Sequence, residues 1–345
     1  MKDVKIQLLL LSCLIMIICI TPLEAAIPSG IKKTIDDVNK EGPYLGIVVP
    51  NAFEMNPLLN SSNFVVNSKL PYLDVQGRRF HLGTVKNQKV IMVMTGLSML
   101  NSGLSTQLLL TLFEIKGIVH FGIAGNANSN LQIGDVTIPQ YWAHTGLWNW
   151  QRYGDDAQDE LAFEAFGDYT RQYGYLNFSD YDVDQKSSGS YLNSVWYQPE
   201  EVFPITGTPE VRQHAFWVQV DQNYYNLSQK LEGTNLTRCV NATTCLPRSP
   251  VVARVDKGCS ANAFVDNAAY RQFLQSKFNI TPIDMETAAV ALVSLEFGTP
   301  FIAIRSLSDL AGGGSAQSNE AAIFSSLAAE NCVTVVVKFI SLLNY

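Results

Sequence analysis

Residues 287–304 constrain the fold of this chain more than any other segment. Residues 287–297 are mostly alanine, valine and leucine, the composition of a helix that is buried on most of its surface. Gly298 and Pro300 end that helix, and residues 301–304 have the short apolar run of a strand buried on both faces. A buried helix followed directly by a buried strand indicates a layered α/β fold.

Two carboxylates flank this segment. Glu286 precedes the helix, and Asp309 follows the strand just before the glycine run at residues 312–314. Ligands of open α/β sheets bind at the carboxyl ends of the strands, where Asp309 is expected. Each carboxylate also has a simpler explanation, because Glu286 complements the positive end of a helix and Asp309 can cap the next turn or helix. The segment alone leaves both explanations open.

Strand-like and helix-like segments alternate along the rest of the chain. We expect strands at residues 46–50, 64–66, 77–85, 89–96, 117–121 and 251–255, and helices at residues 31–40, 98–113 and 262–278. The loop expected at residues 51–56 carries a third carboxylate, Glu54. This alternation is typical of a layered α/β domain.

Composition narrows the choice of partner. With 47% hydrophobic and 16% charged residues, the chain can form a large core, and we expect one domain over residues 27–345. The formal net charge is -7 and Lys and Arg form no run. Phosphate backbones require clustered cations, so we expect a small-molecule ligand and no nucleic-acid partner.

Residues 1–26 are expected to form a signal peptide. Two lysines precede an apolar run at residues 8–20, and the small residues Ala25 and Ala26 follow it. That run is shorter than the roughly 20 residues of a transmembrane helix, so a signal anchor is the lesser alternative. We therefore predict a protein of the secretory pathway, extracellular or vacuolar. No other segment is expected to span a membrane once the signal is removed.

In the secretory pathway, sequons can be glycosylated and cysteines can form disulfides. Candidate glycosylation sites are the Asn-x-Ser/Thr sequons that begin at Asn60, Asn177, Asn226, Asn235, Asn241 and Asn279. An oxidising compartment permits disulfides, and Cys239 and Cys245 are the best candidate pair because few residues separate them. Cys332 lies in an apolar segment and is expected to be a buried thiol, whereas Cys259 is undecided.

The region around residues 145–250 is dense in aromatic side chains and lacks clear periodicity. Because no linker-like run brackets it, we interpret it as an insertion within the domain. The aromatic residues could form a lid over a base, although ordinary local packing is the simpler explanation. The four histidines, at positions 81, 120, 144 and 214, lack metal-ligand spacing, so we predict no metal and no cofactor.

A stretch with several glycines spans residues 117–139 and begins with a predicted strand. Gly122 and Gly125 let the backbone turn and expose N–H groups to an anion or a sugar, although a structural bend would also explain them. The stretch lacks the GK[ST] of a P-loop and does not match the GxGxxG dinucleotide fingerprint.

Together these segments resemble the purine nucleoside phosphorylase and methylthioadenosine/adenosylhomocysteine nucleosidase superfamily. Within it, the chain is similar to the secreted plant branch that includes bark storage proteins, wound-induced proteins and cytokinin riboside phosphorylases. The resemblance covers nearly the whole chain from Gly46 onward. It implies a three-layer α/β/α fold with a central twisted mixed sheet and a long aromatic-rich insertion.

The resemblance also implies roles for individual residues. Asp309 would protonate the purine at N7, Glu286 would hold the ribose hydroxyls, and Glu54 would activate an attacking water. Substrate contacts are implied for Phe264, Val265, Met285, Ser308, Thr95, Ala124 and Gly125. Phosphate contacts are implied for His120, Gly122 and Thr95, and His120 stands where phosphorolytic relatives commonly have an arginine.

The implied activity is cleavage of the N-ribosidic bond of purine-type nucleosides, with cytokinin ribosides among the candidate substrates. The plant branch favours phosphorolysis, which gives the free base and ribose 1-phosphate with inorganic phosphate as co-substrate. Glu54 favours water instead, so a hydrolytic nucleosidase is the alternative. A catalytically silent nitrogen-storage glycoprotein and a nucleoside-binding sensor are the non-enzymatic alternatives. The oligomeric relatives imply that the chain forms a homo-oligomer.

Overall fold

The computed structural model describes residues 27–150, 175–177, 194–209, 211, 213–313 and 320–343. The chain divides into two units, Met1–Glu41 and Gly42–Tyr345. Within the first unit the structure describes helix α2 (Ser29–Lys40), close to the bounds that the sequence predicts. The predicted signal peptide and most of the insertion between residues 151 and 193 lie outside the described residues.

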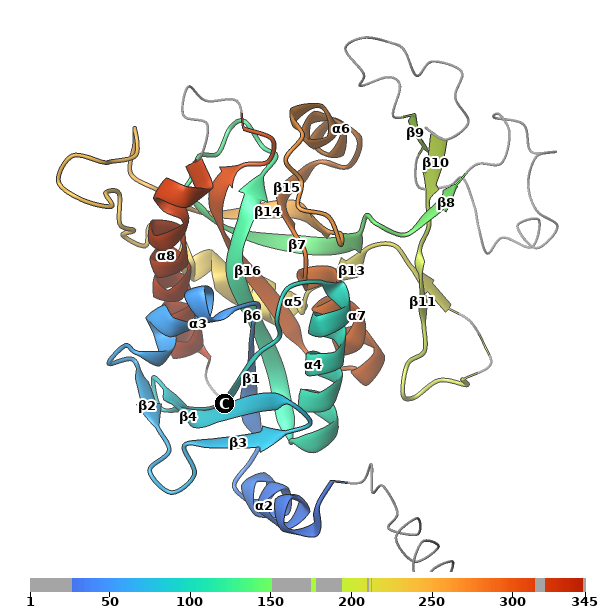
Figure 1. Cartoon of the computed structure of the whole chain (residues 1–345), viewed down its shortest axis with the longest axis vertical. Coiled ribbons are helices and arrows are strands. Elements are labelled where there is room, and N and C mark those ends of the chain that lie inside the picture. The colour runs from blue at the N-terminus through green and yellow to red at the C-terminus, as the bar shows by residue number, and fades with distance from the viewer. Residues whose placement is uncertain are drawn as a thin grey trace, which may run out of the picture. The chain divides into compact units, whose positions relative to one another are not determined.

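An 11-stranded mixed sheet forms the centre of the second unit (Figure 1). Its order is β13-β7-β14-β15-β6-β1-β5-β4-β2, with β16 paired to β6 and β7 and with β3 paired to β4. The bounds are β1 (Tyr44–Val49), β2 (Phe64–Val66), β3 (Tyr72–Val75), β4 (Arg78–Val85), β5 (Gln88–Met94), β6 (Ile115–Asn126), β7 (Val136–His144), β13 (Val218–Gln219), β14 (Val252–Ser260), β15 (Ile280–Asp284) and β16 (Phe301–Leu310). Because β1 is parallel to β6 and β6 is parallel to β16, their carboxyl ends lie at one end of the sheet.

Helices cover both faces of the sheet, as Figure 1 shows. On one side lie α3 (Ala52–Leu59) and α8 (Glu320–Leu342), and on the other lie α4 (Met99–Leu112) and α7 (Thr287–Phe297). Two further helices are α5 (Gln222–Ser228), followed by a 3-10 turn at Gln229–Leu231, and α6 (Ala268–Phe278). The predicted three-layer α/β/α fold is therefore confirmed.

Helix α7 has the bounds that its apolar pattern predicts, and Gly298 ends it with φ 64, in the left-handed region that suits glycine. Strand β16 is longer than the predicted residues 301–304. Its second half continues beside β6 although Arg305, Ser306 and Ser308 are polar and buried. Hydropathy does not detect buried polar residues, so the pattern located the strand but not its end.

Helix α8 corrects one expectation about membranes. Over Ala321–Leu342 it is long and apolar enough, by length and composition, to cross a bilayer, which we had not expected of any segment after the first residues. In the structure 61% of its most apolar window is buried, and the helix packs against β6 and β16. This environment is that of a core helix.

Two helix starts differ from the prediction and both lie beside the site described below. Residues 51–56, predicted as a loop, form the start of α3, because the Asn51 side chain caps this helix by accepting the N–H of Glu54 at 3.0 Å. Helix α6 begins at Ala268 and not at residue 262, because Asn267 caps it by accepting the N–H of Tyr270. Residues 261–267 are consequently a loop.

The described part of the insertion forms two small sheets. One consists of β8 (Trp148–Trp150), β9 (Tyr175–Asn177) and β10 (Ser194–Tyr197), and the other of β11 (Glu200–Val202) and β12 (Gln213–Ala215). Tyr197 and Phe216 pack against Phe278 of α6, with ring centroids 5.3 and 5.7 Å apart. These aromatic side chains therefore form a local core with α6.

A disulfide joins Cys239 and Cys245, whereas Cys259 and Cys332 are free and buried. Burial raises the pKa of both free thiols to about 12, so neither is available as a thiolate near neutral pH. Most of the sequon asparagines are exposed: Asn60, Asn226, Asn235, Asn241 and Asn279. The exposure of Asn177 in β9 is not among the described features, and glycosylation stays a prediction.

Candidate active site

A cavity of about 220 Å³ opens where the carboxyl ends of β1, β6, β15 and β16 meet. The residues predicted from the sequence that line it are Glu54, Ala124, Gly125, Phe264, Val265, Met285, Glu286, Ser308 and Asp309. Three other predicted residues, Thr95, His120 and Gly122, lie outside its wall. The fold therefore brings together residues that are far apart in the sequence; Glu54 and Asp309, for example, are 255 positions apart.

Glu54 lies in the first turn of α3, just after β1. Asn51 Nδ2 donates to one carboxylate oxygen at 2.7 Å, and the backbone N–H of Ile123 donates to the other at 2.6 Å. Burial raises the pKa of Glu54 to about 7, although Arg305 and the Ile123 N–H oppose the rise. A carboxyl group with such a pKa, held rigidly at a cavity wall, is suited to take a proton from water near neutral pH.

Glu286 stands at the N-cap position of α7, and its side chain reaches across to the start of α4. One carboxylate oxygen accepts the N–H of Ser98 at 3.2 Å, and the other accepts the N–H of Met285 at 3.3 Å. Burial raises the pKa of Glu286, an effect that Arg305 opposes. Its remaining acceptor capacity faces the cavity, where hydroxyl groups of a ligand can donate.

Ser308 and Asp309 lie near the end of β16, at a β-bulge. The register of β16 against β6 shifts between Leu307 and Asp309, so that Asp309 pairs with Gly125. A bulge re-aims the side chains that follow it, and here it brings Asp309 to the cavity wall. Ser308 Oγ donates to Asp309 Oδ1 at 2.6 Å, which fixes the orientation of that carboxyl group.

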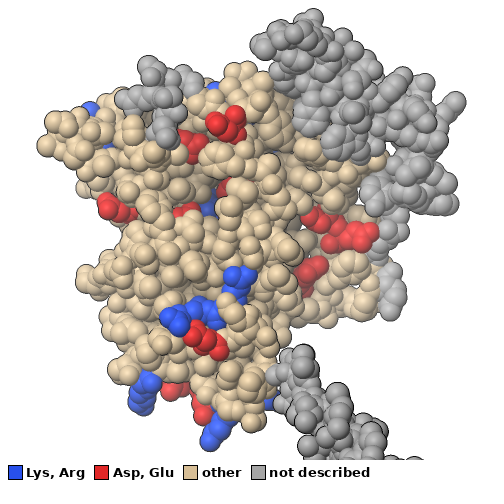
Figure 2. All heavy atoms as spheres, in the orientation of Figure 1, with Lys and Arg blue, Asp and Glu red and all other residues tan. Residues whose placement is uncertain are grey.

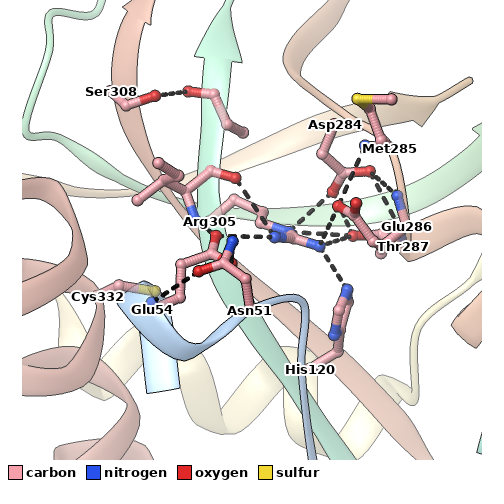
Figure 3. A network of polar contacts seen from close by, with 12 residues as sticks. Asn51, Glu54, His120, Asp284, Met285, Glu286, Thr287, Arg305, Ser308 and Cys332 are labelled. Carbon is pink, nitrogen blue, oxygen red and sulfur yellow. Dashed lines mark hydrogen bonds and ion pairs between the residues drawn. The ribbon is translucent and has the colours of Figure 1, made fainter. Parts of the chain in front are cut away.

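Arg305 is fully buried at the floor of the site and connects its carboxylates, as Figure 3 shows. Arg305 Nε lies 2.8 Å from Asp284 Oδ2, Nη1 lies 3.9 Å from Glu54 Oε1, and Nη2 lies 3.8 Å from Glu286 Oε2. Nη2 also donates to Thr287 Oγ1 at 2.8 Å. One guanidinium thus serves three carboxylates, and the excess of acidic groups favours the protonated forms of Glu54 and Glu286.

Asp284, the last residue of β15, holds this arrangement in place. Its Oδ1 accepts hydrogen bonds from Ser260 Oγ at 2.5 Å and from the N–H groups of Glu286 and Thr287 at 3.1 Å. Its Oδ2 accepts from the Thr287 hydroxyl and faces Arg305. Sequence reasoning missed Asp284 and Arg305. The available signals were an arginine within an apolar strand and an acid at the end of another, since buried charges need partners.

His120 is fully buried on the inner side of Arg305, away from the cavity. Its Nε2 contacts Arg305 Nη2, and its Nδ1 lies 2.8 Å from the carbonyl oxygen of Val48. Because an arginine can only donate, Nε2 accepts and Nδ1 donates to Val48, which defines a neutral ring. Burial and Arg305 lower the pKa of His120 well below its usual value. The predicted role as a phosphate ligand therefore does not fit this buried, neutral and doubly paired histidine.

Thr95 and Gly122 support the site from behind. Thr95 is buried, and its hydroxyl donates to the carbonyl oxygen of Gly96 at 2.7 Å. A Cβ atom at Gly122 would lie 2.3 Å from Arg305 Nη1 and 2.4 Å from Glu54 Oε1. Glycine at position 122 is therefore required for the close approach of Arg305 to Glu54. The phosphate contacts predicted for Thr95 and Gly122 stay predictions.

All ionisable side chains among the described residues of the cavity wall are acidic. Its carboxylates are Glu54, Asp284, Glu286 and Asp309, and the described lining residues include no lysine, arginine or histidine. Among the residues that the structure describes, no group of three or more His, Cys, Asp and Glu side chains is arranged to hold a metal ion. Such a wall can accept hydrogen bonds from hydroxyl groups and can bind an apolar ring, but it repels anions.

Exposed apolar side chains lie at the cavity and on helix α4, which begins two residues after Leu97. Leu97 and Phe264 line it and are 60% and 70% exposed, and Leu100 and Leu104 on α4 are 69% and 58% exposed. We call these four residues the apolar rim. Helix α4 (Met99–Leu112) contains no charged residue. Figure 2 shows that charged side chains form small, separate groups on the visible face and that most of that face is uncharged.

The mixed sheet and the cavity at its strand ends define an α/β protein with the nucleoside phosphorylase/hydrolase fold. The chain belongs to the Phosphorylase superfamily, whose sequence signature matches residues 44–341. The resemblance inferred from the sequence is thereby confirmed.

Relatives include both storage proteins and enzymes. Bark storage protein A of Populus deltoides is 30% identical over 299 residues, which cover 86% of this chain and 88% of that protein. The 5'-methylthioadenosine/S-adenosylhomocysteine nucleosidase of Marinomonas sp. is 25% identical over 258 residues, covering 74% and 83% of the two chains. The solved structure of futalosine hydrolase of Helicobacter pylori superimposes with a TM-score of 0.58 at 17% identity over 88% of this chain and 100% of that chain. The last similarity shows the fold alone.

Proposed function

We propose that this protein hydrolyses the N-ribosidic bond of purine-type nucleosides. The observation that carries the proposal is the cavity wall, in which four carboxylates and an apolar surface meet without a cationic side chain among the described residues. An uncharged nucleoside offers hydroxyl groups to the carboxylates and an aromatic ring to the apolar surface. Membership of the Phosphorylase superfamily and the relation to nucleosidases support cleavage of this bond.

The residues divide the chemistry between the two ends of the cavity. Asp309 donates a proton to the purine as the electron pair of the C1′–N9 bond moves onto the base. Glu286 accepts hydrogen bonds from the ribose hydroxyls and stabilises the positive charge that develops on the sugar. Glu54 takes a proton from the water whose oxygen forms the new bond to C1′. The products are the neutral free base and ribose, and the proton that Asp309 gives to the base is balanced by the one that Glu54 takes from water.

Water fits the nucleophile position better than phosphate does. A phosphate beside Glu54 and Glu286 would face like charges in a site with little solvent, where repulsion is strong. Arg305 is fully buried and already serves Asp284, Glu54 and Glu286, so it is not free to bind a further anion. The neutral ring of His120 does not supply the missing charge.

A storage protein is the second candidate, because bark storage protein A is 30% identical to this chain. A storage role alone does not require an excess of buried acids, which lowers the free energy of unfolding unless each acid is compensated. Glu54 and Glu286 are only 2% and 3% exposed, and both have raised pKa values. This arrangement, in which one arginine compensates three buried acids only in part, favours catalysis over storage.

The deciding measurement is base release with and without phosphate. Adenosine, inosine and isopentenyladenosine are incubated with the protein in phosphate-free buffer and in millimolar phosphate, and the base and sugar products are identified. We expect equal release in both buffers, with ribose as the sugar product. Release that requires phosphate and yields ribose 1-phosphate would contradict hydrolysis but keep ribosidic cleavage. No release from any nucleoside would contradict the enzymatic function and leave storage.

We also propose that the protein acts within the secretory pathway or outside the cell. The exposed sequon asparagines and the Cys239–Cys245 disulfide support this placement, because both modifications arise in that pathway. Protein purified from its natural tissue should lose mass on endoglycosidase treatment. A mass equal to that of the full unmodified chain would contradict the placement.

A further inference from the structure

The first turn of α6 contacts three parts of the molecule. The proposed mechanism gives these three parts no common role. Before that turn lies the loop at residues 261–267, which supplies Phe264 and Val265 to the cavity. Against it lies the turn that follows β16, at residues 311–313, where Ala311 also lines the cavity. Behind it lies the aromatic core of the insertion.

Arg271 connects α6 to the turn after β16. Its Nη1 donates to the carbonyl oxygen of Gly313 at 2.6 Å. A hydrogen bond from a charged donor to a backbone carbonyl is among the stronger kinds in proteins. Gly313 lies only four positions after Asp309, so this bond fixes the segment that continues from the proposed proton donor.

Gly312 brings the same two segments into direct backbone contact. It adopts φ +95, and a Cβ atom at this position would lie 2.2 Å from the backbone nitrogen of Ala268 and 2.3 Å from the carbonyl carbon of Asn267. Only a glycine permits this approach. The turn after β16 and the start of α6 are therefore packed against each other at the end of the cavity where Val265 and Ala311 lie.

Tyr270 connects the same helical turn to the insertion. Its hydroxyl group lies 2.9 Å from that of Tyr197, which is fully buried in β10. The Tyr197 ring is stacked on Phe273 of α6 with centroids 6.2 Å apart. The insertion thus packs against α6 through Tyr197.

We propose that Arg271 is a positioning residue of the base site. It holds the turn at residues 311–313 against the loop at residues 261–267, so that Phe264, Val265 and Ala311 present one fixed wall to the base. The aromatic insertion contributes through Tyr197 and Tyr270, which keep the start of α6 in place. The assignment of this wall to a purine base rests on the proposed function, whereas the coupling of the two segments does not.

Arg271→Gln tests the proposal against Lys277→Gln, which removes the same charge from an exposed position of the same helix. The wall contacts the base in the ground state and in the transition state alike, so its loosening raises KM and leaves kcat unchanged. We expect Arg271→Gln to raise KM about tenfold with kcat within about twofold, and Arg271→Lys to recover most of the loss because an ammonium group can also donate to Gly313. A fall in kcat at unchanged KM, or equal behaviour of Arg271→Gln and Lys277→Gln, would overturn the proposal.

A second arm does not depend on catalysis. Amide hydrogen exchange at residues 263–268 and 311–313 should be faster in Arg271→Gln than in Lys277→Gln, and faster in Gly312→Ala than in Gly233→Ala. Gly233 also has a positive φ, +73, but a Cβ atom there would meet no atom within 4 Å. If the wild type releases no base, the proposed function fails, and these exchange rates alone decide the coupling. Equal rates in each variant and its control would refute it.

Discussion

Glu54→Gln tests the most unusual electrostatic feature of the site, an acid buried to 2% exposure beside an arginine that it shares with two other acids. Glutamine has nearly the same volume and keeps a carbonyl oxygen that can accept the N–H of Ile123. The substitution therefore removes the ionisation of this side chain and its hydrogen bond from Asn51 Nδ2, and it leaves the packing almost unchanged. Any pH dependence that disappears in the variant belongs to Glu54.

The sign of the effect follows from proton linkage. Burial raises the pKa of Glu54 from 4.5 to about 7, so the folded protein binds this proton more tightly than the unfolded chain does. The stability associated with the raised pKa is present below the unfolded value and is lost as pH rises through about 7. A rise from 4.5 to about 7 corresponds to roughly 3 kcal/mol in the free energy of unfolding. The wild type should lose about 3 kcal/mol relative to Glu54→Gln between pH 4 and pH 8.

The assay is urea unfolding of the wild type, Glu54→Gln and Glu232→Gln at intervals from pH 4 to pH 8. Glu232 is exposed, so its substitution controls for the loss of one carboxylate from the surface. The same proteins are assayed for base release, where the kcat/KM of the wild type should rise up to about pH 7 and that of Glu54→Gln should lose this rise. Parallel stability curves for the wild type and Glu54→Gln would show that Arg305 fully compensates the buried charge, and the reasoning would be wrong.

Three further substitutions test other parts of the site. Asp309→Asn should lower kcat for purine nucleosides at least about a hundredfold, because it removes the proton donor; near-normal turnover would place the acid elsewhere. Gly122→Ala should lower the free energy of unfolding by about 1–3 kcal/mol or more and abolish base release. The control Gly103→Ala should be tolerated, because its added Cβ atom would lie 3.9 Å from the nearest neighbour. Thermal unfolding of the two variants compares their stabilities. If the chain forms a homo-oligomer through the apolar rim, Leu100→Asp should convert it into monomers, as measured by light scattering. A wild-type protein that is already monomeric would refute this association.

The apolar parts of this fold could be predicted from sequence patterns, and the polar floor of its site could not. Helix α7 was located correctly because its apolar composition and the glycine after it are both local signals. Glu286 directly precedes this helix and Asp309 lies a few residues after the next apolar run, and the family resemblance selected both as candidates. Arg305 was missed because its partners come from strand β15 (Asp284) and helix α3 (Glu54) and become its neighbours only in the folded protein. No spacing in the sequence encodes that contact.

His120 shows the converse case, a side chain whose environment the sequence does not reveal. In the sequence it lies within the glycine-containing stretch at residues 117–139, where a cation would bind an anion. In the structure, its Nε2 accepts a hydrogen bond from Arg305 and its Nδ1 donates to the Val48 carbonyl oxygen, so both ring nitrogens have partners within the protein. A histidine at the end of a strand can contact a ligand only if its side chain faces the cavity; a side chain that faces the interior forms hydrogen bonds within the protein. That orientation is set by the pairing of β6 with β1 and β16 and is not visible in a single sequence.

Strand β16 carries both Arg305 and Asp309, which in the proposed mechanism serve the nucleophile end and the base end of the cavity. Four residues of extended chain span roughly 13 Å, and the bulge before Asp309 shortens that distance only slightly. The separation between the two ends of the reaction is therefore set by covalent geometry and not by the packing of movable loops. Changes in the loops at residues 261–267 and 311–313 can alter which base is accepted. If the proposed function holds, insertion or deletion of a single residue within β16 should abolish cleavage of every substrate at once.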